Sequence, residues 1–121
     1  MTQITHWING ALDTKKPERT GDIYNPATGK VTGTVAFGNA ATVDSAVAAA
    51  TTAFAEWRHS SLTKRTQVLF AFRELVAQNK EKIAALITAE HGKVLSDAAG
   101  EVTRGLEVVE FACGIPHLLK G

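Results

Sequence analysis

The sequence has little of what several classes of protein require. Its one cysteine, Cys113, excludes an intramolecular disulfide and favours a reducing compartment. Basic and acidic residues nearly cancel, 13 against 12, so no charge excess favours nucleic acid or anionic lipid. No apolar run approaches the roughly 20 residues that cross a bilayer, and the N-terminus lacks the pattern of a secretion signal. We therefore expect a cytoplasmic protein that binds neither nucleic acid nor membrane.

What is present indicates one modest globular unit. The 121 residues are 45% hydrophobic and 21% charged, which is typical of a soluble domain and too little for a two-domain enzyme. Residues 1–38 hold five of the ten glycines and two of the three prolines, whereas the rest is rich in alanine, leucine and valine. The composition predicts strands in residues 1–38 and helices in residues 39–121.

Two turn signals predict two β-hairpins. Asn9-Gly10 stands between apolar positions and is typical of a tight hairpin turn. The segment 25–29, Asn-Pro-Ala-Thr-Gly, separates Ile23-Tyr24 from an alternating run over residues 31–37, and Gly29 can adopt the positive φ that closes such a turn. The polar residues between the two hairpins, 13–21, are expected to form an exposed loop.

Apolar residues at helical spacing predict three helices. The first is expected over residues 43–57 with Thr42 as its cap, the second over 61–91 with Gly92 ending it, and the third over 96–113. Two isolated hairpins are marginal unless a larger sheet or helix layer covers them. The chain also ends in apolar residues directly after a turn signal, so we expect it to belong to a larger α/β fold.

The sequence offers no complete catalytic or metal site of its own. Cys113 has apolar neighbours and no adjacent lysine or histidine, which favours a buried structural thiol over a nucleophile. Neither G-x-G-x-x-G nor G-x-x-x-x-G-K-[ST] occurs, so no phosphate-binding loop is expected. The four histidines lack the spacing of metal ligands: His6, His59, His91 and His117. We expect no catalytic, cofactor-binding or metal residues within this chain.

One polar residue is a candidate for binding. On a helix, Arg104 lies one turn from Gly100 and one turn from Val108, so its neighbours on that face are small and apolar. A guanidinium there could hold a bound carboxylate through a bidentate fork. The alternative is a surface ion pair with Glu101 or Glu107 at i,i+3 spacing, which stabilises a helix by only a few tenths of a kcal/mol.

Several motifs in order resemble the aldehyde dehydrogenase superfamily. They are Trp-Ile-Asn-Gly at 7–10, Tyr-Asn-Pro-Ala-Thr-Gly at 24–29, Ala-Phe-Ala-Glu-Trp at 53–57 and Glu-His-Gly-Lys at 90–93. The stretch over residues 100–121 is similar to the CoA-acylating methylmalonate-semialdehyde dehydrogenases. The resemblance covers the whole chain.

The resemblance implies a much longer enzyme, of which residues 1–121 are the N-terminal portion of the NAD-binding domain. NAD would be the cofactor and CoA a co-substrate, both bound mainly outside this chain, and the nucleophilic cysteine with its assisting residues would lie beyond Gly121. The partners implied are the remainder of the polypeptide and further copies of it in a dimer or tetramer. Cys113 does not match the motif of the family's nucleophile.

The implied reaction is oxidation of methylmalonate or malonate semialdehyde to propionyl-CoA or acetyl-CoA, a step of valine or inositol catabolism. The matching helix of the superfamily lines the substrate tunnel, so the resemblance favours Arg104 as the ligand of the substrate carboxylate, with a second arginine outside this chain. The chain alone is then expected to be inactive. The alternative is a short protein of the same fold that acts as a non-catalytic interaction module through its exposed hairpins and apolar C-terminal tail.

Overall fold

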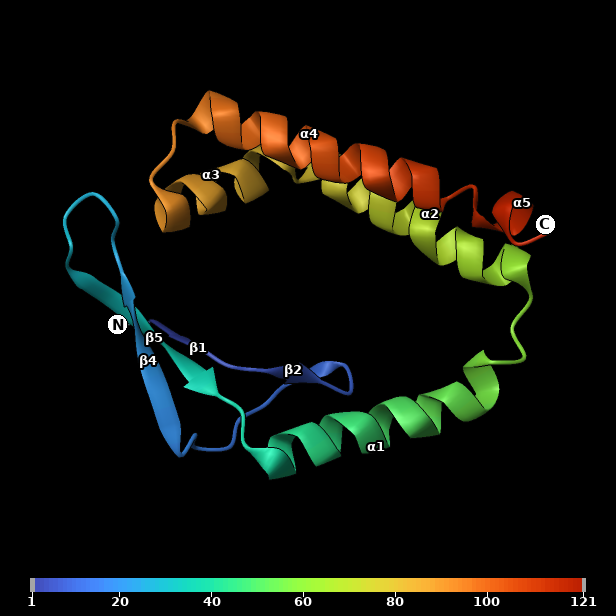
Figure 1. The fold of residues 1–121 in the computed structure, drawn as a ribbon, viewed down its shortest axis with the longest axis horizontal. Helices are drawn as coiled ribbons and strands as arrows, with labels where there is room; N and C mark the ends of the chain where they lie inside the picture. The colour runs from blue at the N-terminus through green and yellow to red at the C-terminus, as the bar shows by residue number, and fades with distance from the viewer. Residues whose placement is uncertain (1, 121) are drawn as a thin grey trace. The chain divides into compact units, whose positions relative to one another are not determined.

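The computed structural model describes residues 2–120, in which strands are followed by helices (Figure 1). This order confirms the predicted α/β class, with strands ending at residue 37 and helices beginning at residue 40. The chain separates into two compact units, residues 1–59 and 60–121. The boundary between the two units comes just after the first helix, whereas the amino-acid composition changes earlier, near Gly38.

A three-stranded sheet forms part of the first unit. It contains β1 (Thr2–Ile4), β5 (Val31–Phe37) and β4 (Arg19–Tyr24) in that spatial order. The predicted hairpin of β4 and β5 is confirmed by their antiparallel pairing. The expectation of a loop over residues 13–21 is wrong for its last three residues, because β4 begins at Arg19, which pairs with Phe37.

Strand β1 was not predicted from the sequence, and its pairing explains a glycine. It runs parallel to β5, with Thr2 opposite Gly33. A Cβ atom at Gly33 would lie 2.5 Å from the carbonyl oxygen of Thr2, closer than side-chain atoms approach a backbone. Glycine therefore lets β1 close against the sheet.

The second predicted hairpin is also confirmed. It pairs β2 (Trp7–Ile8) with β3 (Ala11–Leu12) around Asn9 and Gly10, whose φ values are 54° and 76°. Two positive φ values in succession are what a type I′ turn requires. The hairpin faces α1 (Ala40–Trp57) across a shallow groove, which Trp7 and Ile8 line together with alanines of the helix.

Helix α1 begins earlier than predicted because Asn39, not Thr42, is its cap. The Oδ1 atom of Asn39 accepts a hydrogen bond from the Thr42 backbone N–H at 3.0 Å, and the Thr42 hydroxyl accepts one from the Asn39 N–H at 3.4 Å. This reciprocal pair is a capping box. The predicted apolar face exists, but no residue of α1 is buried, and Val47 and Phe54 are 58% and 57% exposed.

The second predicted helix is two helices in the structure. Helix α2 (Leu62–Gln78) and helix α3 (Lys80–His91) are separated at Asn79, which has φ −105° and ψ 12°. The Asn79 side-chain amide donates to the Leu75 carbonyl oxygen at 2.8 Å, and the Asn79 backbone N–H donates to the same oxygen at 3.1 Å, so the side chain folds back onto the last turn of α2. Gly92 ends α3 with a φ of 86°, as predicted.

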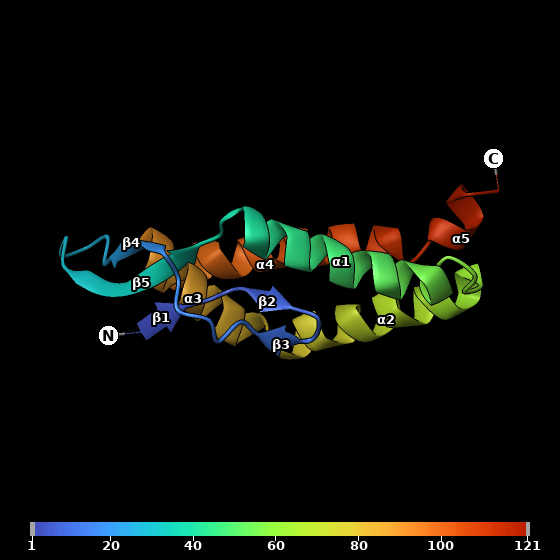
Figure 2. The same ribbon diagram turned by 90° about the horizontal axis from the view of Figure 1, so that it is seen from below.

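Helix α4 (Leu95–Ala112) confirms the third predicted helix, and the short α5 (Ile115–Leu118) follows it. The described residues thus form five helices rather than three. Helix α4 lies along both α2 and α3 (Figure 1 and Figure 2).

The core between α3 and α4 is built on small side chains. Ala84 and Ala98 are completely buried, and Val102 is 6% exposed beside them. No large side chain among the described residues is fully buried.

Candidate functional site

Within the second unit, helix α4 presents Arg104 on a face that α2 and α3 leave exposed. Val102 is buried in the core with α3, whereas Arg104 is exposed. Successive residues of an α-helix are rotated by about 100° around its axis. Arg104 follows Val102 by two residues, so it lies about 200° around the helix, on nearly the opposite side of α4. The packing of the apolar stripe therefore fixes the side of α4 from which the Arg104 side chain leaves the helix.

The guanidinium of Arg104 makes no hydrogen bond or ion pair with any described residue. The surface pair with Glu101 or Glu107, considered from the sequence, is not formed. Glu101 instead accepts a hydrogen bond from Lys93 Nζ at 2.6 Å. Among the described residues, Arg104 therefore has no directly bonded acidic partner.

Small and apolar residues lie one turn from Arg104, as the spacing predicts, together with the acids Glu101 and Glu107. Gly100 precedes it by one turn, Val108 follows by one turn, and Phe111 lies a further turn along. Val108 and Phe111 are 69% and 70% exposed, so neither packs against another described element. The face offers one planar cation beside apolar surface, which is suited to a small carboxylate with an apolar or reactive end.

A lysine-centred network holds the carboxylates that precede Arg104. Lys93 Nζ lies 2.9 Å from Asp97 Oδ2 as well as 2.6 Å from Glu101 Oε1. The pKa of Lys93 is raised, first by the hydrogen bond to Glu101 and then by that to Asp97. The pKa of Asp97 is lowered, mainly by its hydrogen bond to Lys93 and to a smaller extent by the charge of Arg104. Both acids thus make their hydrogen bonds to Lys93 rather than to Arg104, whose charge still acts on Asp97.

The spacing of the three residues along the sequence indicates this network. Lys93 and Asp97 stand at i,i+4 spacing, and Glu101 follows by four more residues. Such spacing places the three side chains on one side of a helix and its first turn.

The substitution Asp97→Asn tests the network through its pH dependence. At neutral pH the variant should melt at a lower temperature than the wild type, because Lys93 loses a charged partner. A lowered pKa in the folded protein means that ionised Asp97 stabilises the fold above its ordinary pKa of 3.8 and stops doing so as the pH falls through the lowered value. The two melting temperatures should therefore converge below pH 3.8, as followed by thermal melts across a pH series.

A matched control is Glu107→Gln, which removes an exposed acid of the same helix that has no ion pair with a described residue. This variant should melt with the wild type at every pH. A gap between Asp97→Asn and the wild type that stayed constant through the acid range would contradict the assignment.

The remaining reactive groups of the described residues are the thiol of Cys113 and the histidine and acidic side chains. Cys113 is buried, as predicted, at 9% exposure. It is the C-cap residue of α4, and its backbone N–H donates to carbonyl oxygens of the last turn of that helix. Among residues 2–120, no three histidine, cysteine or acidic side chains come together to hold a metal ion. No described helix combines the length and the apolar character needed to cross a membrane.

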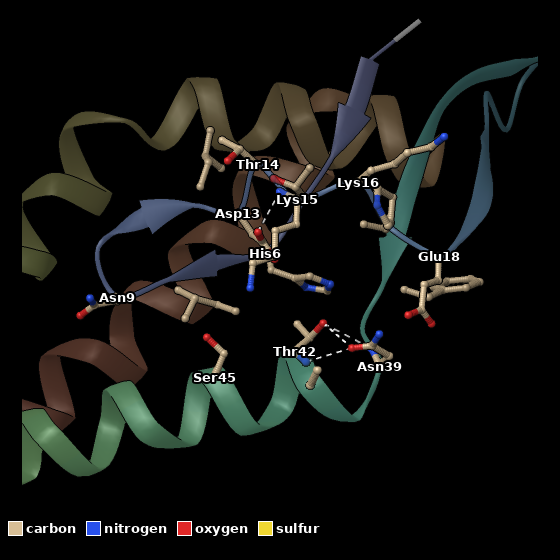
Figure 3. A pocket seen from close by; sticks show the side chains of 17 residues that line it. His6, Asn9, Asp13, Thr14, Lys15, Lys16, Glu18, Asn39, Thr42 and Ser45 are labelled. Carbon is tan, nitrogen blue, oxygen red and sulfur yellow. Dashed lines mark hydrogen bonds between the residues drawn. The ribbon is translucent and has the colours of Figure 1, made fainter.

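A polar cavity of about 420 Å³ lies in the first unit, between the loop after β3 and the start of α1 (Figure 3). Its polar groups mainly form local turns: Asp13 Oδ1 accepts from the Lys15 N–H at 3.0 Å, and Asn39 caps α1. The ring nitrogen Nε2 of His6 is buried without a hydrogen-bond partner. The Thr42 hydroxyl in the cavity donates to Asn39 Oδ1 at 3.0 Å and so belongs to the cap of α1.

The sequence profile of the aldehyde dehydrogenase family matches residues 13–121, and the chain belongs to this family. Malonate-semialdehyde dehydrogenase of Pseudomonas aeruginosa is 44% identical over 121 residues, which are 100% of this chain and 24% of that protein. The mitochondrial acylating methylmalonate-semialdehyde/malonate-semialdehyde dehydrogenase of Rattus norvegicus is 44% identical over 115 residues, 95% of this chain and 22% of that protein.

Solved structures agree with the sequence comparison. Methylmalonate-semialdehyde dehydrogenase from Oceanimonas doudoroffii superposes with a TM-score of 0.95 at 46% identity, covering 100% of this chain and 25% of that one. A protein from Sinorhizobium meliloti 1021, solved with NAD, gives a TM-score of 0.92 at 40% identity and covers 98% of this chain and 24% of that one. The chain thus spans about a quarter of the length of these relatives, and the resemblance inferred from its motifs is confirmed.

Proposed function

We propose that this chain is the N-terminal portion of the NAD-binding domain of an NAD-dependent, CoA-acylating dehydrogenase. The enzyme oxidises methylmalonate or malonate semialdehyde to propionyl-CoA or acetyl-CoA. The observation that carries this proposal is the 44% identity along the entire chain to a protein named malonate-semialdehyde dehydrogenase. The high identity and the TM-score of 0.95 to a methylmalonate-semialdehyde dehydrogenase support the same assignment.

Within this enzyme, Arg104 binds the carboxylate of the substrate. Three observations support the role: the side chain is exposed, it has no ion-pair partner among the described residues, and Gly100 and the exposed Val108 lie one turn from it. Both semialdehydes carry a carboxylate one carbon away from the aldehyde, and a guanidinium binds such a group through two parallel hydrogen bonds. A second arginine outside this chain completes the carboxylate site.

The rest of the polypeptide is the first partner of this chain. Its exposed apolar side chains include those of α1 and of the Arg104 face of α4, and they are more numerous than an isolated domain of this size needs. Burial against the missing three quarters of the enzyme accounts for them. The complete enzyme is a cytoplasmic homo-oligomer, a dimer or a tetramer.

NAD accepts the hydride when bound, and CoA accepts the acyl group, but both bind mainly outside this chain. The sequence has no glycine-rich phosphate loop. Lys93, the basic residue at the start of α4, is already held by two carboxylates and is poorly placed to serve a phosphate. The nucleophilic cysteine also lies outside, since Cys113 is buried at a helix C-terminus.

The test is a product analysis of the full-length enzyme. Incubation with methylmalonate semialdehyde, NAD and CoA should yield NADH and propionyl-CoA in equal amounts, with the carboxylate released as CO2 or bicarbonate. Absorbance follows NADH, and mass spectrometry identifies the thioester. The 121-residue chain alone should yield neither product.

The control reaction omits CoA, and no thioester should then form. Accumulation of free methylmalonate in the complete reaction would reject the acylating assignment. Reduction of NAD by the isolated chain would reject the proposal that its catalytic groups lie elsewhere.

A further inference from the structure

Gly100 occupies a position in α4 for which the described fold gives no reason. Glycine is a poor helix former, and this one stands in the interior of an 18-residue helix. A Cβ atom added there would meet no atom within 4 Å. Unlike Gly33, which the neighbouring strand requires, Gly100 is therefore not needed for the packing of the described residues.

The direction of the Arg104 side chain connects it to Gly100. Long side chains on an α-helix lean toward the helix N-terminus and cover the preceding turn. Gly100 is in that turn, four residues before Arg104. The charge of Arg104 also contributes, after the dominant hydrogen bond from Lys93, to the lowered pKa of Asp97, which lies one turn further toward the N-terminus. A carboxylate held by the guanidinium would thus lie beside the bare backbone of Gly100.

We propose that Gly100 determines the size of the substituent that the substrate carries on the carbon next to its carboxylate. This inference rests on the proposed role of Arg104 in binding that carboxylate. Methylmalonate semialdehyde differs from malonate semialdehyde by one methyl group on this carbon. The absent side chain of Gly100 provides the space for that methyl group, so Gly100 is a specificity residue and takes no part in the chemical step.

The test is Gly100→Ala in the full-length enzyme, assayed with both semialdehydes. The added methyl group should lower kcat/KM for methylmalonate semialdehyde by about 10-fold or more, since one methyl group in a fitted pocket changes specificity by roughly 10- to 200-fold. For malonate semialdehyde, kcat/KM should change by less than about 3-fold on the same reasoning. Gly100→Val should widen the difference between the substrates. The melting temperature should not fall, because alanine favours the helix.

The matched control is Gly105→Ala. Gly105 is in the same helix, a Cβ atom there also meets nothing within 4 Å, and it lies on a different side of α4 from Gly100. This variant should keep the wild-type ratio of the two kcat/KM values.

An unchanged ratio in Gly100→Ala, or an equal loss on both substrates, would overturn the inference while leaving the proposed function intact. The proposed function fails separately, if the wild-type enzyme oxidises neither semialdehyde to its CoA thioester.

Discussion

Replacement of Arg104 by leucine in the full-length enzyme is expected to lower kcat/KM for both semialdehydes by roughly 30- to 1,000-fold. This range corresponds to about 2–4 kcal/mol, the usual cost of removing one partner from a buried, hydrogen-bonded charge pair. Leucine keeps an apolar stem but leaves the substrate carboxylate without its fork of donors. Propanal, an uncharged aldehyde of similar size, should be oxidised at nearly the wild-type rate. Steady-state kinetics with the three aldehydes measure the difference.

Two further variants show whether the loss in Arg104→Leu comes from the missing charge, from the missing bidentate geometry, or from general damage to the enzyme. Arg104→Lys retains the charge but not the bidentate fork, so its loss should be intermediate. Arg73→Leu removes another partly exposed arginine, one that is paired with Glu110 through Nη2 at 2.7 Å. It should not change the preference for carboxylated aldehydes. Equal losses on charged and uncharged aldehydes in Arg104→Leu would reject a role in carboxylate binding.

The elements that the sequence predicts well are those defined by a few adjacent residues. The turn at Asn9-Gly10 and the end of α3 at Gly92 both depend on positive φ values that these residue types adopt easily. The boundary of α2 at Ser61 is similar, because a serine side chain caps the helix that follows it by accepting a hydrogen bond from the Lys64 N–H at 3.2 Å. Such signals act within three or four residues and are visible in the sequence.

The sequence-based predictions are wrong where the structure depends on which of several possible partners a residue binds. The parallel pairing of β1 with β5 joins residues about thirty positions apart, such as Thr2 and Gly33, and a three-residue strand carries too little pattern to reveal it. At Asn79, a side chain that bonds to the preceding turn interrupts a continuous apolar periodicity. Asparagine and threonine both cap helices well, so Asn39 and Thr42 are equally plausible caps. Asn39 is the cap because its backbone is extended, as an N-cap residue requires.

The candidate site was only partly visible in the sequence for the same reason. Spacing alone allowed Arg104 either to pair with a neighbouring glutamate or to stay available for a ligand. Lys93 binds Glu101 from a position just before α4. Glu107 also forms no ion pair with Arg104 among the described residues, and spacing does not show this. The openness at Gly100 likewise depends on which elements pack against α4, and spacing cannot reveal that.

The contact between α3 and α4 predicts the second large effect, for Ala84→Asp. Ala84 is completely buried against Ala98 and Val102 in a core that has no polar partner for a carboxylate among its members. A carboxylate there must remain ionised without a partner, become protonated, or force the helices apart. We expect a loss of about 3–5 kcal/mol in the free energy of unfolding, the range found when an uncompensated charge is left inside a protein.

The control for this loss is Ala85→Asp, because Ala85 is the next residue of the same helix but is exposed. Both variants bear the same reduced helix propensity of aspartate, about 0.5–0.7 kcal/mol relative to alanine, so the difference between them isolates the cost of burial. Urea unfolding of both variants in the same full-length background measures that difference. Equal destabilisation at the two positions would mean that α3 and α4 do not make this close contact, and the direction assigned to Arg104 on the opposite side of α4 would lose its structural basis.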